Sequence, residues 1–385
     1  MLDPGARRLF HLYLDITVPK ILAAPAGYSN PFASEVVRWA FADPLIMNII
    51  LALGGFPLGD TDDPDLLERS RLQYYGEAVK ALQDALTNVN DGSTRSTTRL
   101  LLATMLLCTF ESMRGNPQGV FCSHLSASRV FAHALDSPEQ ELRDDQLTRI
   151  LVEYYAFYEL CSKVRLDVDH QEPGLCGQSM LLQVEHLRSL SGFGVFFGSS
   201  WSLYRVVPRI CELAAKRRCE LAKDIDLGCL ETFRELQDVL SEWRCEEGPQ
   251  PVACDPDHQF SDARAAAGEL VRNSLLLFLY SSMFSDREFI LGVSQPIVNA
   301  SIKLLPIVHP SSFANTSFWP FLVIATYATT PEQQTRILGF LPPIMPLVVR
   351  ATQILRWVWN SSQNSIGLQA LADIIHIRNI SYCFG

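Results

Sequence analysis

Glu111 and His124 are the two ionisable residues whose placement first suggests chemistry. Glu111 follows an apolar run over residues 100–110, and His124 stands at the start of another segment rich in apolar residues. A carboxylate beside an imidazole can act as a general acid and base. The same two groups can also satisfy each other's hydrogen-bonding needs inside a protein core, where an unpaired polar group is costly.

The segment between the two residues favours the structural role. The turn sequence GNPQG, at residues 115–119, separates two apolar segments and predicts an antiparallel helical hairpin. At a rise of about 1.5 Å per residue, Glu111 and His124 then lie at nearly the same height along the two helices. Because no nucleophile or metal motif accompanies them, we expect a buried structural pair joined by a charge-assisted hydrogen bond, and no catalytic residue.

Two other stretches resemble phosphate or magnesium motifs only superficially. The cluster DTDDPD, at residues 60–65, contains Pro64, which favours a helix start with Asp63 as its N-cap. The stretch GFGVFFGSSW, at residues 192–201, lacks the third glycine and the preceding strand of a dinucleotide fingerprint. We therefore expect a helix cap at the first stretch, a turn at the second, and no cofactor at either.

A zinc site is also not expected. The ten cysteines include no C-x-x-C pair. Cys245, Cys254 and His258 are widely spaced and have no convincing fourth ligand. The sequence thus predicts no metal site, and the cysteines are expected to be reduced and mostly buried.

The segments that carry these residues have the sequence features of helices. Thr330 and Ser137 each begin a capping box with proline and glutamine, while Asp43 and Asp63 each precede a proline. Apolar residues then recur every three or four positions, and strand-like alternation is nearly absent. We predict an all-α multi-helix bundle of about a dozen or more helices. We treat 1–385 as one domain whose two helical halves are joined by a linker near 245–259.

Composition narrows the class of protein. Of the 385 residues, 48% are hydrophobic and 19% are charged, which excludes a disordered chain. The formal net charge of −10 repels phosphate backbones, so direct nucleic-acid binding is not expected. No uninterrupted apolar run approaches the roughly 18 residues of a membrane-spanning helix, so no membrane partner is expected either.

The order of several helix-packing motifs resembles the fungal-specific transcription factor domain, the regulatory region of fungal zinc-binuclear-cluster activators. The similarity covers most of the chain. It is carried by Glu111…Gly115…Phe121…His124-Leu125…Ala127-Ser128, by the opening HLYLDITVPKI…NPFASEVVRWAFADPLIMNIILALGG, by GSSWSLYRVVPRICELA, and by SFWPFLVIATYATTPEQQTRILGFL…LRWVWN.

The resemblance implies a transcriptional regulator that acts in the nucleus, although a cytoplasmic location is also open. No six-cysteine run of the family's zinc cluster occurs in these residues, so DNA binding is not carried over. The regulator would sense a small apolar ligand or a protein partner, and homodimerisation is left open. Aromatic faces could line a ligand cavity between the two halves, with walls from Tyr154, Tyr155, Phe157, Tyr158, Phe318 and Trp319.

An enzyme is the alternative, from a different class of protein. The scaffold could serve fungal secondary metabolism as a cofactor-free cyclase or as a binding protein. The missing zinc cluster favours this alternative, and the missing catalytic motif opposes it. We therefore expect regulation, and no enzymatic activity.

Overall fold

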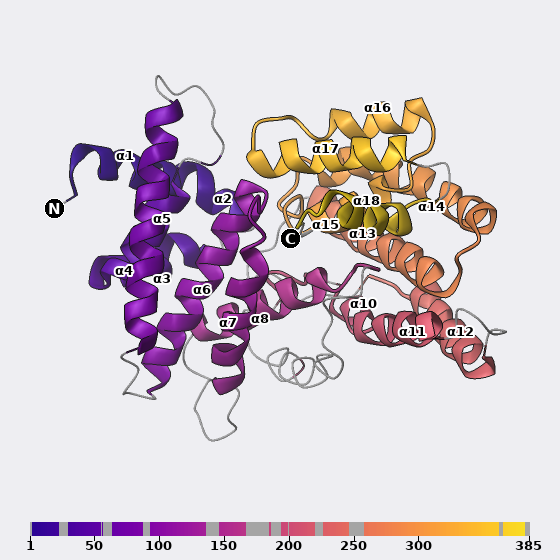
Figure 1. The fold of residues 1–385 in the computed structure, drawn as a ribbon, viewed down its shortest axis with the longest axis horizontal. Coiled ribbons are helices and arrows are strands. Elements are labelled where there is room, and N and C mark those ends of the chain that lie inside the picture. The colour runs from indigo at the N-terminus through magenta and orange to yellow at the C-terminus, as the bar shows by residue number, and fades with distance from the viewer. Residues whose placement is uncertain are drawn as a thin grey trace. The chain divides into compact units, whose positions relative to one another are not determined.

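The chain is built from helices, as its computed structural model shows. The structure describes residues 2–22, 30–54, 56, 64–87, 93–135, 146–166, 185, 194–198, 200–219, 226–245, 258–361 and 365–381. Within these ranges every regular element is a helix, and none is a strand (Figure 1). The predicted all-α fold is confirmed.

The predicted caps start helices where the structure describes them. Asp43 caps α4 (Pro44–Leu53) by accepting a hydrogen bond from the Leu45 N–H at 3.0 Å. At α16 (Pro331–Gly339) the Thr330 hydroxyl accepts from the Gln333 N–H, and the Gln333 side chain accepts from the Thr330 N–H, both at 3.2 Å. The box at Ser137 and the cap at Asp63 lie outside the described residues.

The chain divides into two compact units that are not contiguous in sequence. Unit 1 comprises 1–156, 183–195 and 343–349, and unit 2 comprises 157–182, 196–342 and 350–385. Of the linker predicted near 245–259, residues 246–257 lie outside the described residues. The two helices that flank it, α12 (Leu227–Glu242) and α13 (His258–Met283), pack against each other within unit 2.

Unit 1 is organised around two apolar helices. Every residue of α6 (Thr94–Arg114) from 100 to 113 is buried, and α4 packs against its neighbours on several sides. A helix that is apolar all round belongs in the interior of a fold. The remaining elements of unit 1 are α1 (Pro4–Leu12), the π-helical turn Tyr13–Thr17, α2 (Val18–Ile21), α3 (Pro31–Ala42), α5 (Pro64–Thr87), α7 (Phe121–Ala134) and the first part of α8 (Gln146–Ser162).

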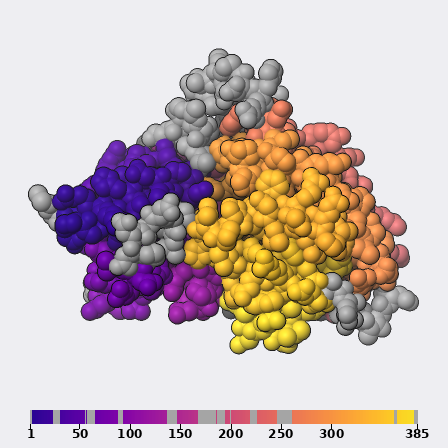
Figure 2. Space-filling model, turned by 90° about the horizontal axis from the view of Figure 1, so that it is seen from above, coloured from indigo at the N-terminus to yellow at the C-terminus, as the bar shows by residue number. Residues whose placement is uncertain are grey.

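Unit 2 is organised around α13. This helix contacts α10 (Trp201–Tyr204), α11 (Val207–Cys219), α12, α14 (Arg287–Val308), α15 (Phe318–Ala325) and α18 (Leu368–Arg378). Most of α17 (Pro346–Asn360) also belongs to this unit. Figure 2 shows the orange-to-yellow C-terminal helices of unit 2 packed into one continuous surface. The unit thus surrounds one long central helix with shorter ones.

The sequence analysis expected no segment long and apolar enough to span a membrane, and one helix of unit 2 does not fit that expectation. Within the described residues, α14 alone is long and apolar enough to cross a membrane by length and composition, and only 33% of its 18-residue apolar window is buried. A search for uninterrupted apolar runs misses it, because Ser, Gln, Asn and one Lys interrupt the sequence of α14. These polar residues break the run without removing its mean apolar character.

Candidate functional site

The hairpin predicted around GNPQG is present. α6 ends at Arg114 and is capped by Gly115, whose φ of 81° suits a residue without a Cβ and whose N–H donates to the carbonyl of Ser112 at 2.8 Å. The side chain of Asn116 then accepts from the Phe121 N–H at 3.1 Å and holds the start of α7. α6 and α7 pack against each other. The turn chemistry therefore brings the helices that carry Glu111 and His124 side by side.

Tyr75 of α5 links these two residues. The Tyr75 hydroxyl lies 3.2 Å from Nε2 of His124 and also hydrogen-bonds the Glu111 carboxylate. Glu111 is buried and His124 is half-buried. The expected pair is thus part of a three-residue cluster, and a direct bond between Glu111 and His124 stays a prediction. The sequence analysis missed Tyr75 because it lies 49 residues before His124.

Burial fixes the protonation states in this cluster. It lowers the pKa of His124 to about 4, so the imidazole is neutral near pH 7. Burial and then the hydrogen bond with the Glu111 carboxylate raise the pKa of Tyr75, so the phenol keeps its proton. A neutral imidazole N–H can still donate to a carboxylate, so the direct charge-assisted bond that we expected between His124 and Glu111 stays a prediction. The Tyr75 hydroxyl lies between these two side chains and links them.

A buried arginine lies one turn before Tyr75 on the same helix. Arg71 is fully buried and donates to the Ala52 carbonyl at 3.1 Å and to the Glu68 carboxylate at 2.8 Å. Its guanidinium lies 3.4 Å from the centroid of the Phe56 ring, a cation–π contact. Burial lowers the pKa of Arg71 to about 10, an effect that Glu68 opposes, so Arg71 remains charged at neutral pH.

This arrangement suits a structural role better than catalysis. The Tyr75 ring stacks on Phe110 with 4.4 Å between centroids, which fills the space beside Glu111 with aromatic carbon. Nη2 of Arg71 and Oε2 of Glu111 are buried and have no hydrogen-bond partner among the described residues. A general acid or base must reach a substrate proton, and Glu111 is only 2% exposed. The cluster therefore specifies how α5, α6 and α7 pack.

The aromatic residues predicted to line a ligand cavity belong to two different units. Tyr154 lies in unit 1, where its hydroxyl is 2.6 Å from that of Thr109 and its ring contacts Phe32. Tyr155 is buried in the same unit. Tyr154 lies three positions and Tyr155 two positions before Phe157 in the sequence, yet Phe157 belongs to unit 2.

Phe157 and Trp319 come together in unit 2 through Tyr204. The Phe157 ring lies 5.9 Å from that of Tyr204, and the Trp319 indole N–H donates to the Tyr204 hydroxyl at 3.1 Å. Tyr158 is also buried and contacts Phe157. Burial strongly raises the pKa of Tyr204, which therefore stays protonated. These rings pack on one another, as expected for core residues.

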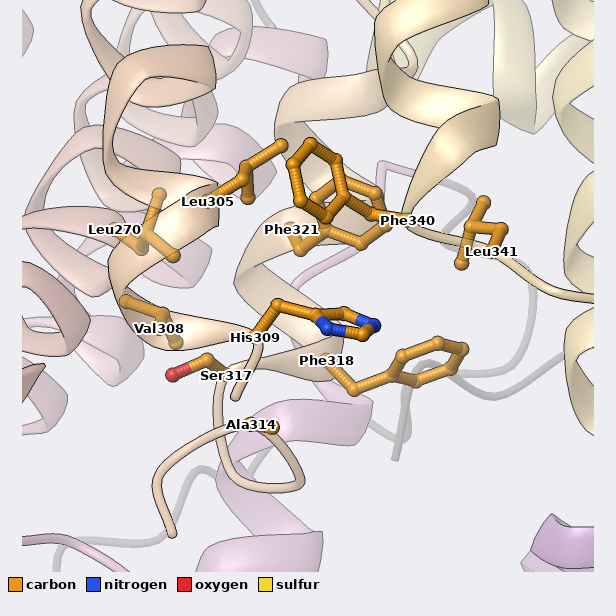
Figure 3. Close-up of a pocket in the computed structure, with 10 residues that line it drawn as sticks. All are labelled: Leu270, Leu305, Val308, His309, Ala314, Ser317, Phe318, Phe321, Phe340 and Leu341. Carbon is orange, nitrogen blue, oxygen red and sulfur yellow. The ribbon is translucent and has the colours of Figure 1, made fainter. Parts of the chain in front are cut away.

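A small apolar pocket in unit 2 includes one of the predicted residues, Phe318 (Figure 3). Figure 3 shows aliphatic side chains from α13 and α14 on one side and rings on the other. The only polar side chains of the lining belong to His309 and Ser317. The aliphatic residues from α13 and α14 are Leu270, Leu305 and Val308, and the rings are those of His309, Phe318, Phe321 and Phe340, with Ala314 and Leu341 as further apolar residues of the lining.

The pocket is small. Its volume is about 60 Å³, room for about two water molecules at the roughly 30 Å³ that each occupies in the liquid. Ligand cavities usually measure about 300–1,000 Å³, so this pocket suits one apolar group of a larger molecule. It is formed by unit 2 residues alone, and Trp319 is not part of its lining. The larger cavity between the halves stays a prediction.

The remaining candidate motifs yield no metal or cofactor site within the described residues. No group of three or more His, Cys, Asp or Glu side chains that could hold a metal ion occurs there. Cys254 lies outside the described residues, and so does the start of the 192–201 stretch. Residues 195–198 of that stretch form a turn, and Ser200 precedes α10 without a side-chain capping bond.

Comparison with known families identifies the family of this chain. The model of the fungal specific transcription factor domain matches residues 8–383. The chain therefore belongs to this family, and the resemblance inferred from the motif order is confirmed. No curated protein and no solved structure matches the chain significantly. The family suggests a regulatory role in transcription and a nuclear location.

Proposed function

We propose that this chain is the regulatory domain of a nuclear transcription regulator, and that an apolar group bound in the Phe318 pocket sets its activity. The family match over residues 8–383 supports the regulatory role. The net charge of −10 favours action through other polypeptides, because it opposes binding to a phosphate backbone. The pocket is the observation that supports sensing.

The residues that line the pocket come from several helices of unit 2, so a bound group can change how these helices pack. Leu270 belongs to α13, Leu305 to α14 and Phe318 to α15, while Phe340 follows α16 directly. A ligand shifts a conformational equilibrium only by binding one state better than another. An apolar group that fills the pocket favours the packing in which these four helices keep their present spacing.

The chemistry of the lining identifies the class of ligand. Apolar carbon dominates, and the exposed His309 ring, 5.5 Å from that of Phe340, lies where an occupant's polar end can meet solvent. The occupant is therefore the apolar end of a small amphiphile or the side chain of a partner protein. Sensing either one is compatible with a regulatory domain.

Thermal unfolding with two simple probes tests the sensor. We expect 1-octanol and octanoate to raise the Tm of the purified chain in a saturable manner, because both bind only the folded state. Ala314, which lines the pocket, offers a filling variant. Ala314→Leu should abolish the rise, while Ala81→Leu, at a similarly half-exposed position on α5, should leave it intact. The absence of a saturable rise with either probe would refute ligand sensing at this pocket.

A reporter assay tests the regulatory role separately. The full chain is fused to an unrelated DNA-binding domain in a fungal host, and transcription of a reporter is measured. We expect the Ala314→Leu fusion to differ from the unsubstituted fusion, and the Ala81→Leu fusion to match it. If the fused chain never alters reporter transcription, the regulatory role is wrong even where octanol binds.

A further inference from the structure

Ser317 is the more deeply buried of the two polar side chains that line the Phe318 pocket. It is 4% exposed, whereas His309 is exposed. The backbone of Ser317 is fully used, because its N–H donates to the Phe313 carbonyl at 3.0 Å and its carbonyl accepts from the Phe321 N–H at 3.1 Å. Its hydroxyl forms no hydrogen bond with any described residue. A buried hydroxyl therefore remains unpaired among the apolar side chains of the lining (Figure 3).

The local sequence explains why this hydroxyl is free. Ser317 occupies the N-cap position of α15, where a serine hydroxyl normally accepts from the N–H of the second or third helical residue. The third residue of this helix is Pro320, which has no N–H. The backbone of Ser317 also has helical angles, with φ of −89° and ψ of 0°, instead of the extended angles of a capping residue. The hydroxyl is therefore available to an occupant of the pocket.

Water is a poor partner for this hydroxyl. A buried water molecule typically makes about three hydrogen bonds with polar groups of the protein. Apart from Ser317 and His309, every side chain of the lining is a hydrocarbon. A molecule that contains both carbon and oxygen fits better, because its carbon contacts the rings while its oxygen pairs with Ser317. A pure hydrocarbon would leave the hydroxyl without a partner, which costs binding free energy.

We propose that the Phe318 pocket binds a small aliphatic molecule through a neutral oxygen, a hydroxyl or a carbonyl, that forms a hydrogen bond with Ser317. This ligand class rests on the proposed function and makes it more specific. A serine hydroxyl can accept from an alcohol or donate to a carbonyl. The oxygen is neutral, because no Lys or Arg lines the pocket to compensate a buried carboxylate. An aliphatic side chain of a partner protein would leave Ser317 unpaired, so a small molecule is the occupant that fits.

The charge of a ligand decides which way it enters the pocket. A fatty acid keeps its carboxylate in solvent near the exposed His309 and inserts only its hydrocarbon end. An alcohol of the same length can turn its oxygen inward, because a neutral hydroxyl loses less hydration and gains a partner in Ser317. Ser317 therefore distinguishes neutral from charged molecules of equal length.

Ligand competition followed by ¹⁹F NMR tests this assignment. The reporter is 1-fluorohexane, in which a fluorine of similar size replaces the hydroxyl of 1-hexanol but accepts hydrogen bonds poorly. We expect 1-hexanol to bind the purified chain about fivefold more tightly than 1-fluorohexane, because it gains one hydrogen bond. Hexanoate should bind no more tightly than 1-fluorohexane.

A substitution at Ser317 tests the role of its hydroxyl. Ser317→Ala should remove the advantage of 1-hexanol and leave the affinities for 1-fluorohexane and hexanoate unchanged. The Tm of this variant without ligand should not fall, because the hydroxyl has no partner to lose. Ser282→Ala, at a similarly buried serine of α13 outside the lining, is the control and should keep the preference for 1-hexanol.

The competition experiment separates two kinds of failure. If 1-hexanol and 1-fluorohexane bind equally tightly, or if Ser317→Ala keeps the preference, the role of Ser317 is wrong while apolar sensing at the pocket stands. If neither molecule binds, the sensor is wrong and the ligand class falls with it.

Discussion

α6 and α14 are both long and rich in apolar residues, yet their surroundings differ completely. α6 is buried without interruption from residue 100 to residue 113, whereas only a third of the apolar window of α14 is buried. α6 also carries polar groups into the core, where Thr98 and Thr109 form hydrogen bonds with hydroxyls of α8. Apolar content alone therefore does not show how many sides of a helix are covered.

The largest effect that we predict is the loss of stability when an apolar side chain of α6, rather than one of α14, is truncated to alanine. Leu106→Ala, in the fully buried part of α6, should lower the free energy of unfolding by about 2–5 kcal/mol, because it removes packing and leaves a cavity. Ile307→Ala, on the exposed side of α14, should change it by no more than about 0.5 kcal/mol. Urea unfolding of the monomer measures both. Equal losses would show that the α14 face is covered within one chain.

The second prediction concerns the polar cluster beside α6. Glu111→Ala and Tyr75→Phe should each lower the free energy of unfolding by about 1–3 kcal/mol, because each leaves buried partners without a hydrogen bond. The double variant should cost less than the sum of the two single losses, since both remove the same bond. Chemical denaturation of all three variants gives the coupling. Strict additivity would contradict a Tyr75–Glu111 hydrogen bond.

The third prediction is a pH dependence that originates in α7. The pKa of His124 is about 4 in the folded chain and about 6.5 in the unfolded chain. As the pH falls, the unfolded chain therefore binds a proton at His124 before the folded chain does. Protonation of His124 therefore does not reduce the free energy of unfolding above about pH 6.5, and it reduces this free energy progressively as the pH falls toward 4. The slope is at most about 1.4 kcal/mol per pH unit. His124→Gln should flatten the stability profile in that window, whereas Lys303→Glu should not.

The smallest effect we predict is at a helix cap in unit 2. Thr330→Ala removes the hydroxyl that accepts from the Gln333 N–H, so α16 loses half of its capping box. The expected cost is about 1 kcal/mol of unfolding free energy. Thr87→Ala, at the exposed C-terminal end of α5, is a control with no N-cap to lose. A cost at Thr330 equal to that at Thr87 would show that the box contributes nothing.

Sequence reasoning succeeded where the physical cause is local. Asp43 and Thr330 cap their helices as predicted, because a cap involves residues only two or three positions apart. Gly115 and Asn116 likewise close the α6–α7 hairpin within a short segment. The family resemblance also followed from the order of such local motifs.

Sequence reasoning failed where the cause is a contact across long separations. Tyr75 lies far in sequence from both Glu111 and His124, and nothing in its own segment shows that its hydroxyl serves both. Tyr154 and Phe157 are close in sequence but belong to different units. The bare side of α14 was missed because the period of a helix reveals an apolar stripe without showing what covers it.

The discontinuous course of the two units has a consequence for synthesis of the chain on the ribosome. Unit 1 includes residues 1–156 but is completed only by residues 343–349, near the end of the chain. At about 5–20 residues per second, the ribosome takes roughly 10–40 s to pass from residue 156 to residue 343. During that time unit 1 lacks its last segment. We therefore expect chaperones that bind nascent chains to associate with the N-terminal helices until translation is nearly finished.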